Sequence, residues 1–422
     1  MTIAQSYQAY PETSEWVGDI EQIKHLVSPR ALTGETVLLN MGPQHPSTHG
    51  VLRLLLELDG ETIVNVIPDI GFLHTGIEKN MEAKRFEQSI VMTDRMDYLA
   101  PFSNNLVYNL AIEKLVDLDV PERAQIIRVL VAELTRLNSH LVWLGTHAFD
   151  IGAMSVALYC FRERELILDL FEMISGQRMM GTYIRPGGVW RDLPDEFLPA
   201  LEKFLEYFPP RIDEYEALLT SNPLWIDRTQ GVGVITPEDA IAWGLSGAIL
   251  RASGVNFDVR KAMPYSGYET YDFDIPLGLH GDVYDRYLVR VQEMRESVRI
   301  IQQAKERVKK VKGPFRSQNR KFVPPPRSEL GHSMEAVIHH FKLWTEGFHA
   351  PKGEVHVMVE SPRGVIACYL SGDGGNKPHR VHFRTPSFIG VQALPKLAQD
   401  HLIADLVAII GSVDPVLGDC DR

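Results

Sequence analysis

The stretch from Asn40 to Arg53, which reads N-M-G-P-Q-H-P-S-T-H-G-V-L-R, carries an unusual set of reactive side chains for a connecting loop. Its two imidazoles, His45 and His49, titrate near neutral pH and could donate protons to a bound ligand. Prolines restrict the backbone here, and glycines allow sharp turns at the ends. The pattern favours a stiff binding loop and, equally, a tight turn whose histidines only cap backbone groups.

A phenol is the second reactive group, in the run Asp94-Arg95-Met96-Asp97-Tyr98. The apolar pattern that follows predicts a helix to about Val116, with Asp97 as its N-cap and Tyr98 in its first turn. A first-turn tyrosine can point its hydroxyl into a cavity beyond the helix end and donate a hydrogen bond. Locally, the pattern favours the simpler interpretation of a core tyrosine with a satisfied hydroxyl.

A long helix is predicted to begin with Pro121 and to give way to the segment Ala148–Ala153. Beside its apolar stripe runs a polar row, which comprises Glu133, Arg136, His140, Trp143 and His147. Such a row is usually solvated, but its histidines and tryptophan also allow burial against another polar element. Asp150 follows the row and could be merely a residue of the terminal turn.

The bulk composition is that of a globular protein. The chain has 422 residues, of which 45% are hydrophobic and 23% are charged, so it can bury a substantial core. Its formal charge of −12 argues against nucleic acid as a partner. The three cysteines form no C-x-x-C pair, which excludes a disulfide framework and argues against a resident iron–sulfur cluster or structural zinc. We find neither a signal peptide nor a membrane-spanning stretch, and expect a soluble chain.

Four segments are predicted along the chain: an N-terminal arm over residues 1–34, a β unit over 35–70, a helical core over 71–350, and a second β unit with the terminal segment over 351–422. In the first β unit, Asp59-Gly60 indicates a tight hairpin turn. The helical core includes predicted helices at Pro237–Ala252 and Gly281–Lys310. The second of these is dense in Arg and Glu, which is typical of a solvent-facing or subunit-facing surface.

Several motifs together resemble a known family, the quinone-site D subunit of respiratory complex I, or NADH-quinone oxidoreductase. The motifs occur in the family's order at 40–53, 71–79, 94–98, 147–153, 175–189 and the C-terminal end. The resemblance covers nearly the whole chain from about Glu35. It implies an α+β, mostly helical fold like that of nickel–iron hydrogenase large subunits, with small antiparallel β units near both ends.

The same resemblance implies a quinone site. Tyr98 and His49 would bond the two carbonyl oxygens of the quinone and donate the protons, while Asp150 would orient and charge His49. Arg95 and His74 would lie near an iron–sulfur cluster of a neighbouring subunit.

Two positions depart from the family pattern. Thr75 replaces an arginine near the cluster, and Met180 replaces a histidine assigned to proton uptake. Because methionine does not titrate, a weaker pH dependence of the cluster potential is expected, and a low-potential quinone such as menaquinone becomes more plausible.

The hydrogenase metal site is implied to be dismantled. Hydrogenase large subunits end in D-P-C-x-x-C, whereas here Asp414-Pro415 is followed by Val416 and Asp419 at the two cysteine positions. The region Gly71–Lys79, which corresponds to the first cysteine pair, contains no cysteine either. No metal or cluster is therefore expected on this chain.

The implied function is quinone reduction, with ubiquinone or menaquinone, in a proton-pumping NADH-quinone oxidoreductase. The complex would lie on the cytoplasmic face of a bacterial plasma membrane. Expected partners are the subunit with the terminal 4Fe-4S cluster, the homologue of the complex's C subunit, and the membrane subunit where quinone enters. Three alternatives remain: a non-catalytic scaffold subunit, a subunit of a related complex that uses ferredoxin as donor, and a hydrogenase-type metalloenzyme, which the missing cysteines argue against.

Overall fold

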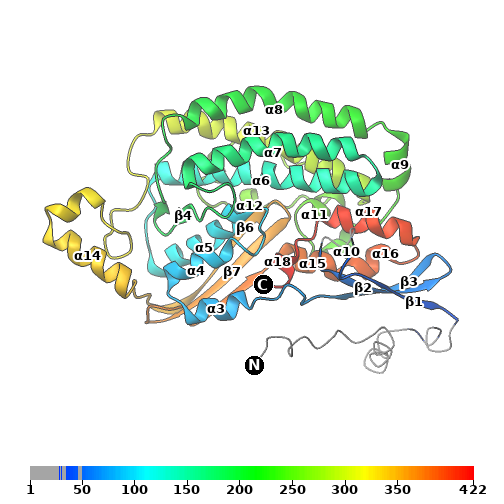
Figure 1. Cartoon of the computed structure of the whole chain (residues 1–422), viewed down its shortest axis with the longest axis horizontal. Helices are drawn as coiled ribbons and strands as arrows, with labels where there is room; N and C mark the ends of the chain where they lie inside the picture. The colour runs from blue at the N-terminus through cyan, green and yellow to red at the C-terminus, as the bar shows by residue number, and fades with distance from the viewer. Residues whose placement is uncertain (1–27, 29, 31–34, 46–49) are drawn as a thin grey trace, which may run out of the picture.

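The structure is a computed structural model that describes residues 28, 30, 35–45 and 50–422. His49 and nearly all of the predicted N-terminal arm, residues 1–34, lie outside this described part. The described chain forms a helical layer above two small sheets (Figure 1). The predicted α+β, mostly helical architecture with antiparallel sheets near both ends is confirmed.

Long helices form the body of the molecule, and α6, α7, α8 and α13 run side by side in the upper layer (Figure 1). The long helices are α5 (Pro101–Val116), α6 (Glu122–Ile151), α7 (Met154–Ser175), α8 (Phe197–Leu219) and α13 (Val283–Lys310). Apolar residues recur along α6 at helical spacing and are buried, for example Ile127, Leu130, Leu134 and Leu141. The α6 core stripe predicted from the sequence is therefore present.

Shorter elements connect and cover these helices. The helices are α3 (Ile77–Ala83), α4 (Phe86–Thr93), α9 (Pro223–Thr229), α10 (Pro237–Ala242), α11 (Ala248–Ala252), α12 (Val259–Ala262), α14 (Met334–Thr345), α15 (Pro386–Gln392), α16 (Leu394–Ala398), α17 (Ile403–Val413) and α18 (Leu417–Cys420). Two 3-10 turns, η4 (Tyr268–Thr270) and η5 (Arg327–Gly331), and a short ribbon of β4 (Ile184–Arg185) and β5 (Gly188–Val189) complete this set.

Each three-stranded sheet is antiparallel and follows chain order. The first contains β1 (Val37–Met41), β2 (Arg53–Asp59) and β3 (Thr62–Asp69), and the second contains β6 (Lys352–Ser361), β7 (Gly364–Asp373) and β8 (Arg380–Arg384). Asp59 pairs with Thr62 across Gly60, whose φ of 63° suits glycine. The hairpin predicted at Asp59-Gly60 is thus confirmed.

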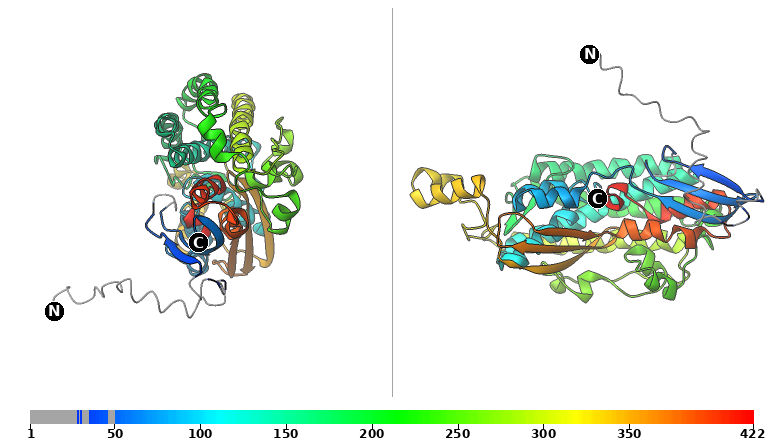
Figure 2. Two further views of the ribbon diagram at one scale, coloured as in Figure 1. Left: turned by 90° about the vertical axis from the view of Figure 1, so that its right-hand side faces the viewer. Right: turned by 90° about the horizontal axis from the view of Figure 1, so that it is seen from below.

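The N-terminal strands and the C-terminal helices share one hydrophobic core. Leu54 and Leu56 of β2 are buried in the same cluster as Ile409 and Ile410 of α17. The second sheet packs instead against α5, beneath the helical layer (Figures 1 and 2). The last residues of the chain therefore end in the middle of the molecule, between the two sheets.

The prediction of one continuous helix over Pro237–Ala252 is wrong, because the residues between α10 and α11 are not helical. Gly244 and Gly247 have φ values of 70° and 67°, which do not continue a helix. A Cβ on Gly247 would lie 2.5 Å from Cα of Gly364, so only glycine allows this close approach to β7.

The polar row of α6 is buried. Its interpretation as a solvated face is therefore wrong, and the alternative prediction of burial against another polar element is confirmed. The opposing polar surface belongs to α13, whose Arg286, Arg290 and Glu293 are also buried. The expectation that α13 presents its charges mainly outward is wrong for this face. Nε2 of His140 on α6 makes a hydrogen bond of 2.8 Å with the Glu293 carboxylate of α13, which links the two helices.

Candidate functional site

Tyr98 lies on a turn that precedes α5, and not in the first turn of that helix. The predicted N-cap at Asp97 is wrong, because α5 begins at Pro101, whose fixed φ and missing N–H suit a first helical position. The Asp97 carboxylate instead accepts a hydrogen bond from the backbone N–H of Leu99 at 3.1 Å. Its backbone carbonyl accepts another from the Asn104 amide at 3.0 Å. Asp97 thus fixes the backbone on both sides of Tyr98.

The C-terminal segment packs directly against this turn. A Cβ on Gly418 would lie 2.4 Å from the carbonyl oxygen of Met96 and 3.4 Å from Cδ1 of Tyr98, so a larger residue would not fit without a shift. The Tyr98 side chain is half-buried. Burial raises the pKa of its hydroxyl, and Arg363 opposes that rise. The phenol is therefore protonated at neutral pH and can donate a hydrogen bond and a proton.

Arg363 lies beneath the Tyr98 turn and was not singled out from the sequence. Its guanidinium donates to the Asp97 carboxylate at 2.6 Å and pairs with the Asp414 carboxylate at 3.2 Å. The side chain is only 1% exposed. The available sequence signal was weak: a single arginine in the short turn between two predicted strands, at Ser361-Pro362-Arg363-Gly364.

The C-terminal segment places two buried carboxyls, those of Asp414 and Asp419, near Arg363. Burial raises the pKa of Asp414 to about 6, against the opposing effect of Arg363. Burial and the nearby charge of Asp97 raise the pKa of Asp419 to about 7. One oxygen of each carboxyl has no hydrogen-bond partner within the described chain. Both carboxyls therefore keep their protons to a higher pH than an ordinary aspartate does.

His74 contacts the same C-terminal segment. Its Nδ1 lies 2.7 Å from the backbone carbonyl oxygen of Asp421, and the Asp421 carboxylate accepts the backbone N–H of Gly71 at 2.9 Å and of Leu73 at 2.8 Å. The segment that holds Tyr98 thus also holds the loop with His74. The structure brings these two predicted site regions together around the end of the chain.

Arg95 is exposed, and its guanidinium donates to the carbonyl oxygen of Val91 at 3.2 Å. The adjacent Asp94 is buried and accepts a hydrogen bond from the hydroxyl of Thr182 at 2.5 Å. That contact places the loop of Met180 beside the Arg95–Tyr98 turn. Met180 and Thr182 have φ values of 54° and 42°, so the loop adopts an uncommon backbone conformation next to the site.

Asp150 lies in the last turn of α6, which ends at Ile151 before Gly152 with a φ of 104°. Its carboxylate is half-buried, and burial raises its pKa to about 6. Within the described residues, no hydrogen bond or ion pair engages this carboxylate, and none links it to Tyr98. His49, its predicted partner, lies outside the described residues.

A pocket of about 170 Å³ opens elsewhere, beside Arg185, Trp190 and Trp344, and includes neither Tyr98 nor Asp150. In the described residues, no group of three His, Cys, Asp or Glu side chains is placed to hold a metal ion. No helix among them is both long and apolar enough to cross a bilayer.

Comparisons with known proteins match nearly the whole chain. The family model described as "Respiratory-chain NADH dehydrogenase, 49 Kd subunit" matches residues 150–422. The D 2 subunit of NADH-quinone oxidoreductase from Chloroflexus aurantiacus is 64% identical over 389 residues, which are 92% of this chain and 95% of the relative. The D subunit of NADH-quinone oxidoreductase from Thermus thermophilus is 58% identical over 393 residues, 93% of this chain and 96% of the relative. The chain therefore belongs to the family of 49-kDa, or D, subunits of respiratory-chain NADH dehydrogenase.

Proposed function

We propose that this chain forms the quinone-reduction site of a proton-pumping NADH-quinone oxidoreductase. Family membership supports a role in that complex, because relatives with 58–64% identity are named as D subunits of NADH-quinone oxidoreductase. The observation that carries the site assignment is the placement of Tyr98. Its protonated phenol is held half-buried against the C-terminal segment in which Val416 and Asp419 replace the cysteines of hydrogenases.

Reduction of a quinone to a quinol requires two electrons and two protons. The electrons would come from an iron–sulfur cluster of a neighbouring subunit, and Arg95 and His74 would lie on the side of that cluster. The Tyr98 hydroxyl would bond one quinone carbonyl and donate a proton to it. His49 would do the same at the other carbonyl.

Asp150 would orient His49 and favour its charged form. The properties of its carboxylate support this role, because a half-buried carboxylate with a raised pKa gains from a cationic partner. Loss of the His49 proton to the quinone would then free Asp150 to move, which would be a first step toward proton pumping.

Neighbouring subunits would complete the site. Tyr98 is half-buried at the described surface, and the pocket beside Trp190 does not include it. We propose that the cluster-bearing subunit, the homologue of the complex's C subunit, and the membrane subunit where quinone enters surround this chain. The chain would be peripheral, on the cytoplasmic side of the membrane.

Met180 favours a low-potential quinone, since it cannot take up a proton when the cluster is reduced.

The test is quinone-reductase activity of membranes with the Y98F complex, with reduction of the iron–sulfur clusters by donor measured in the same sample. We expect the clusters to reduce normally while quinone turnover falls at least tenfold, because the variant lacks one proton donor. The matched control is Y108F. Tyr108 is fully buried, and its hydroxyl donates to the carbonyl of Phe86 at 3.3 Å.

Unchanged turnover in the Y98F complex would contradict the site assignment and favour a scaffold role. Turnover with reduced ferredoxin but not with NADH would keep the quinone site and change the donor.

A further inference from the structure

We propose that Arg363 is a positioning residue for Tyr98, which it holds through Asp97 and Asp414. This inference rests on the proposed function of Tyr98 as a quinone ligand. Arg363 does not reach the quinone in this account. It fixes the turn that carries the phenol and the terminal segment that packs against it.

Every nitrogen of the Arg363 guanidinium has a partner. Nη1 donates to the Asp97 carboxylate at 2.6 Å and to the Ser139 hydroxyl at 2.9 Å. Nε donates to the Asp414 carbonyl oxygen at 3.0 Å, and Nη2 to the Asp414 carboxylate at 3.2 Å. One buried side chain thus joins the turn before α5, the helix α6 and the end of α17.

The contacts lead from Arg363 to both sides of the phenol. Asp97 uses one carboxylate oxygen for Arg363 and the other for the backbone N–H of Leu99, so it connects the guanidinium to the residue after Tyr98. Asp414 begins the segment whose Gly418 backbone packs against the ring of Tyr98. A shift of the guanidinium would therefore move the phenol relative to its support from two directions.

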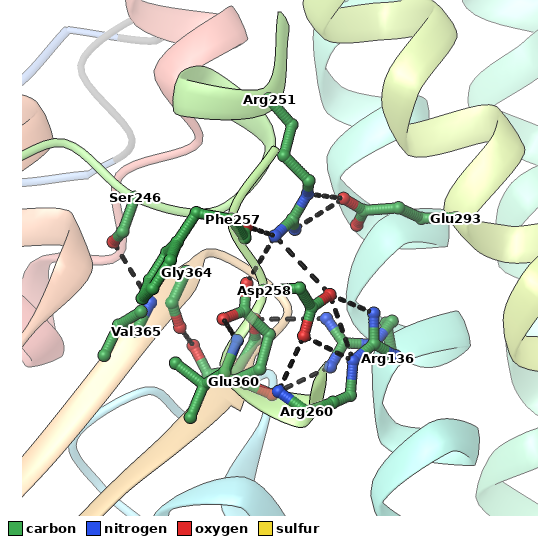
Figure 3. A network of polar contacts seen from close by, with 12 residues as sticks. Arg136, Ser246, Arg251, Phe257, Asp258, Arg260, Glu293, Glu360, Gly364 and Val365 are labelled. Carbon is green, nitrogen blue, oxygen red and sulfur yellow. Dashed lines mark hydrogen bonds and ion pairs between the residues drawn. The ribbon is translucent and has the colours of Figure 1, made fainter. Parts of the chain in front are cut away.

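The turn that presents Arg363 is itself held by a buried cluster of charges (Figure 3). Arg136 donates to the carbonyl oxygens of Glu360 at 2.7 Å and Ser361 at 3.1 Å. The Glu360 carboxylate accepts from Arg251 at 2.8 Å, and Arg251 also pairs with Glu293 at 2.6 Å.

On the other side of the turn, the backbone N–H of Val365 donates to the Ser246 hydroxyl at 3.1 Å. The Arg363 turn is therefore fixed before and after the arginine. A fixed arginine between two carboxylates is suited to positioning, because its planar fork defines direction as well as charge.

The experiment compares R363K, Y98F and the double variant in the assembled complex. Lysine keeps the charge but offers one nitrogen, so it cannot hold both carboxylates in the same geometry. We expect kcat/KM for quinone to fall about tenfold in R363K, since small misplacements of a reacting group have effects of this size. We also expect the KM for quinone to rise in both R363K and Y98F, because each change weakens the hydrogen bond between the phenol and the quinone, while the clusters are still reduced normally.

The double variant separates positioning from general damage. If Arg363 acts through Tyr98, adding R363K to the Y98F variant should lower kcat/KM by less than about twofold relative to Y98F alone. The proposal would be overturned if the losses of kcat/KM from the two single substitutions multiplied in the double variant. It would also be overturned if the R363K complex had an unchanged KM and merely contained fewer active sites. The matched control is R128K, because Arg128 is equally buried and pairs with Glu113, away from the site.

If R363K does not assemble, S139A provides the same test. This substitution removes one neutral hydrogen-bond acceptor of Arg363 and leaves all charges in place. We therefore expect kcat/KM to fall about threefold in S139A. Added to Y98F, the same substitution should cause no further loss. An S139A loss that persists in that background would overturn the proposal. Full activity of Y98F alone would instead refute the proposed function, whatever the arginine variants do.

Discussion

A carboxylate without a partner in a half-buried position is costly, and among the described residues Asp150 is such a group at the end of α6. Burial raises its pKa to about 6, so the protonated form persists to higher pH than for an ordinary aspartate. Between about pH 4 and pH 6 the folded chain holds this proton and an unfolded chain does not. Its contribution to the free energy of unfolding consequently decreases as the pH rises through that window.

The D150N complex should keep its stability and lose activity. The charge of Asp150 does not stabilise the fold above about pH 6, so the amount of assembled complex should equal that of the wild type. Quinone turnover should fall at least tenfold, because in the proposed mechanism His49 would lose the carboxylate that favours its charged form.

The pH profile gives the second readout for Asp150. In the wild type, kcat/KM for quinone should fall below an apparent pKa of about 6, as this carboxylate becomes protonated. The residual activity of D150N should lack this acid limb. Reduction of an artificial acceptor that bypasses the quinone site serves as the control at each pH. An unchanged acid limb in D150N would assign that titration to another group.

At the level of single residues, the sequence identified Tyr98, Asp150, Arg95 and His74 only through the family motifs. The local pattern favoured an ordinary structural role for Tyr98 and allowed one for Asp150. The sequence did not point to Arg363 for a physical reason: its partners Asp97 and Asp414 lie far away in the sequence, and no spacing rule predicts such contacts.

Among the elements, the C-terminal segment after α17 contacts two of the predicted site regions. It contacts the Tyr98 turn through Gly418 and the His74 loop through Asp421. The sequence pointed to this segment because Asp414-Pro415 survives from the hydrogenase pattern. It could not predict that Gly418 would lie so close to the Tyr98 turn that an added Cβ would not fit without a shift.

The G418A variant tests this element. The added Cβ would meet the carbonyl oxygen of Met96 at 2.4 Å, and backbone atoms cannot yield as a flexible side chain does. We expect the segment to shift and quinone turnover to fall about tenfold, with normal cluster reduction. G331A is the matched control, because a Cβ at Gly331 would have no atom within 4 Å. Wild-type turnover in G418A would show that the close packing is not required.

The start of α5 illustrates a limit at the same scale. The sequence predicted Asp97 as the N-cap of this helix, because aspartate is a preferred N-cap residue. The structure uses Asp97 for Arg363 and Leu99 instead, and the helix begins at the proline. Asp97 thus serves a tertiary ion pair, which a local N-cap preference does not reveal.

For the whole molecule, buried charges join the helical layer to the second sheet. Glu293 of α13 contacts Arg251 of α11 at 2.6 Å and His140 of α6 at 2.8 Å, and Arg251 continues to Glu360 of β6. Burial opposes ionisation of Glu293, but Arg251 and His140 outweigh burial and keep its pKa well below the ordinary value. Burial also lowers the pKa of His140 to about 4, so the ring is neutral at pH 7.

The E293Q variant should destabilise the fold by about 3–5 kcal/mol, because removal of one partner leaves the Arg251 charge undercompensated in a buried site. Thermal inactivation of the purified complex measures this loss. The surface variant E202Q, which removes a partner of Lys305, should change stability by less than about 1 kcal/mol. Equal stabilities of E293Q and E202Q would mean that the buried cluster does not hold the layers together.

The sequence could predict the fold class and the hairpin at Asp59, the first through the family motifs and the second through turn chemistry. It could not predict that the polar rows of α6 and α13 face each other. Glu133 and Glu293 pair with Arg260 of α12 and Arg251 of α11, and the pattern of neither long helix reveals these partners.

The central claim is that the quinone head group binds at Tyr98, and labelling of the intact complex with a photoreactive quinone analogue tests it most directly. We predict label on residues 94–98 or on the segment 414–422 that packs against them, and loss of that label with excess unmodified quinone. Competed label confined to other segments of this chain or to other subunits would contradict the claim.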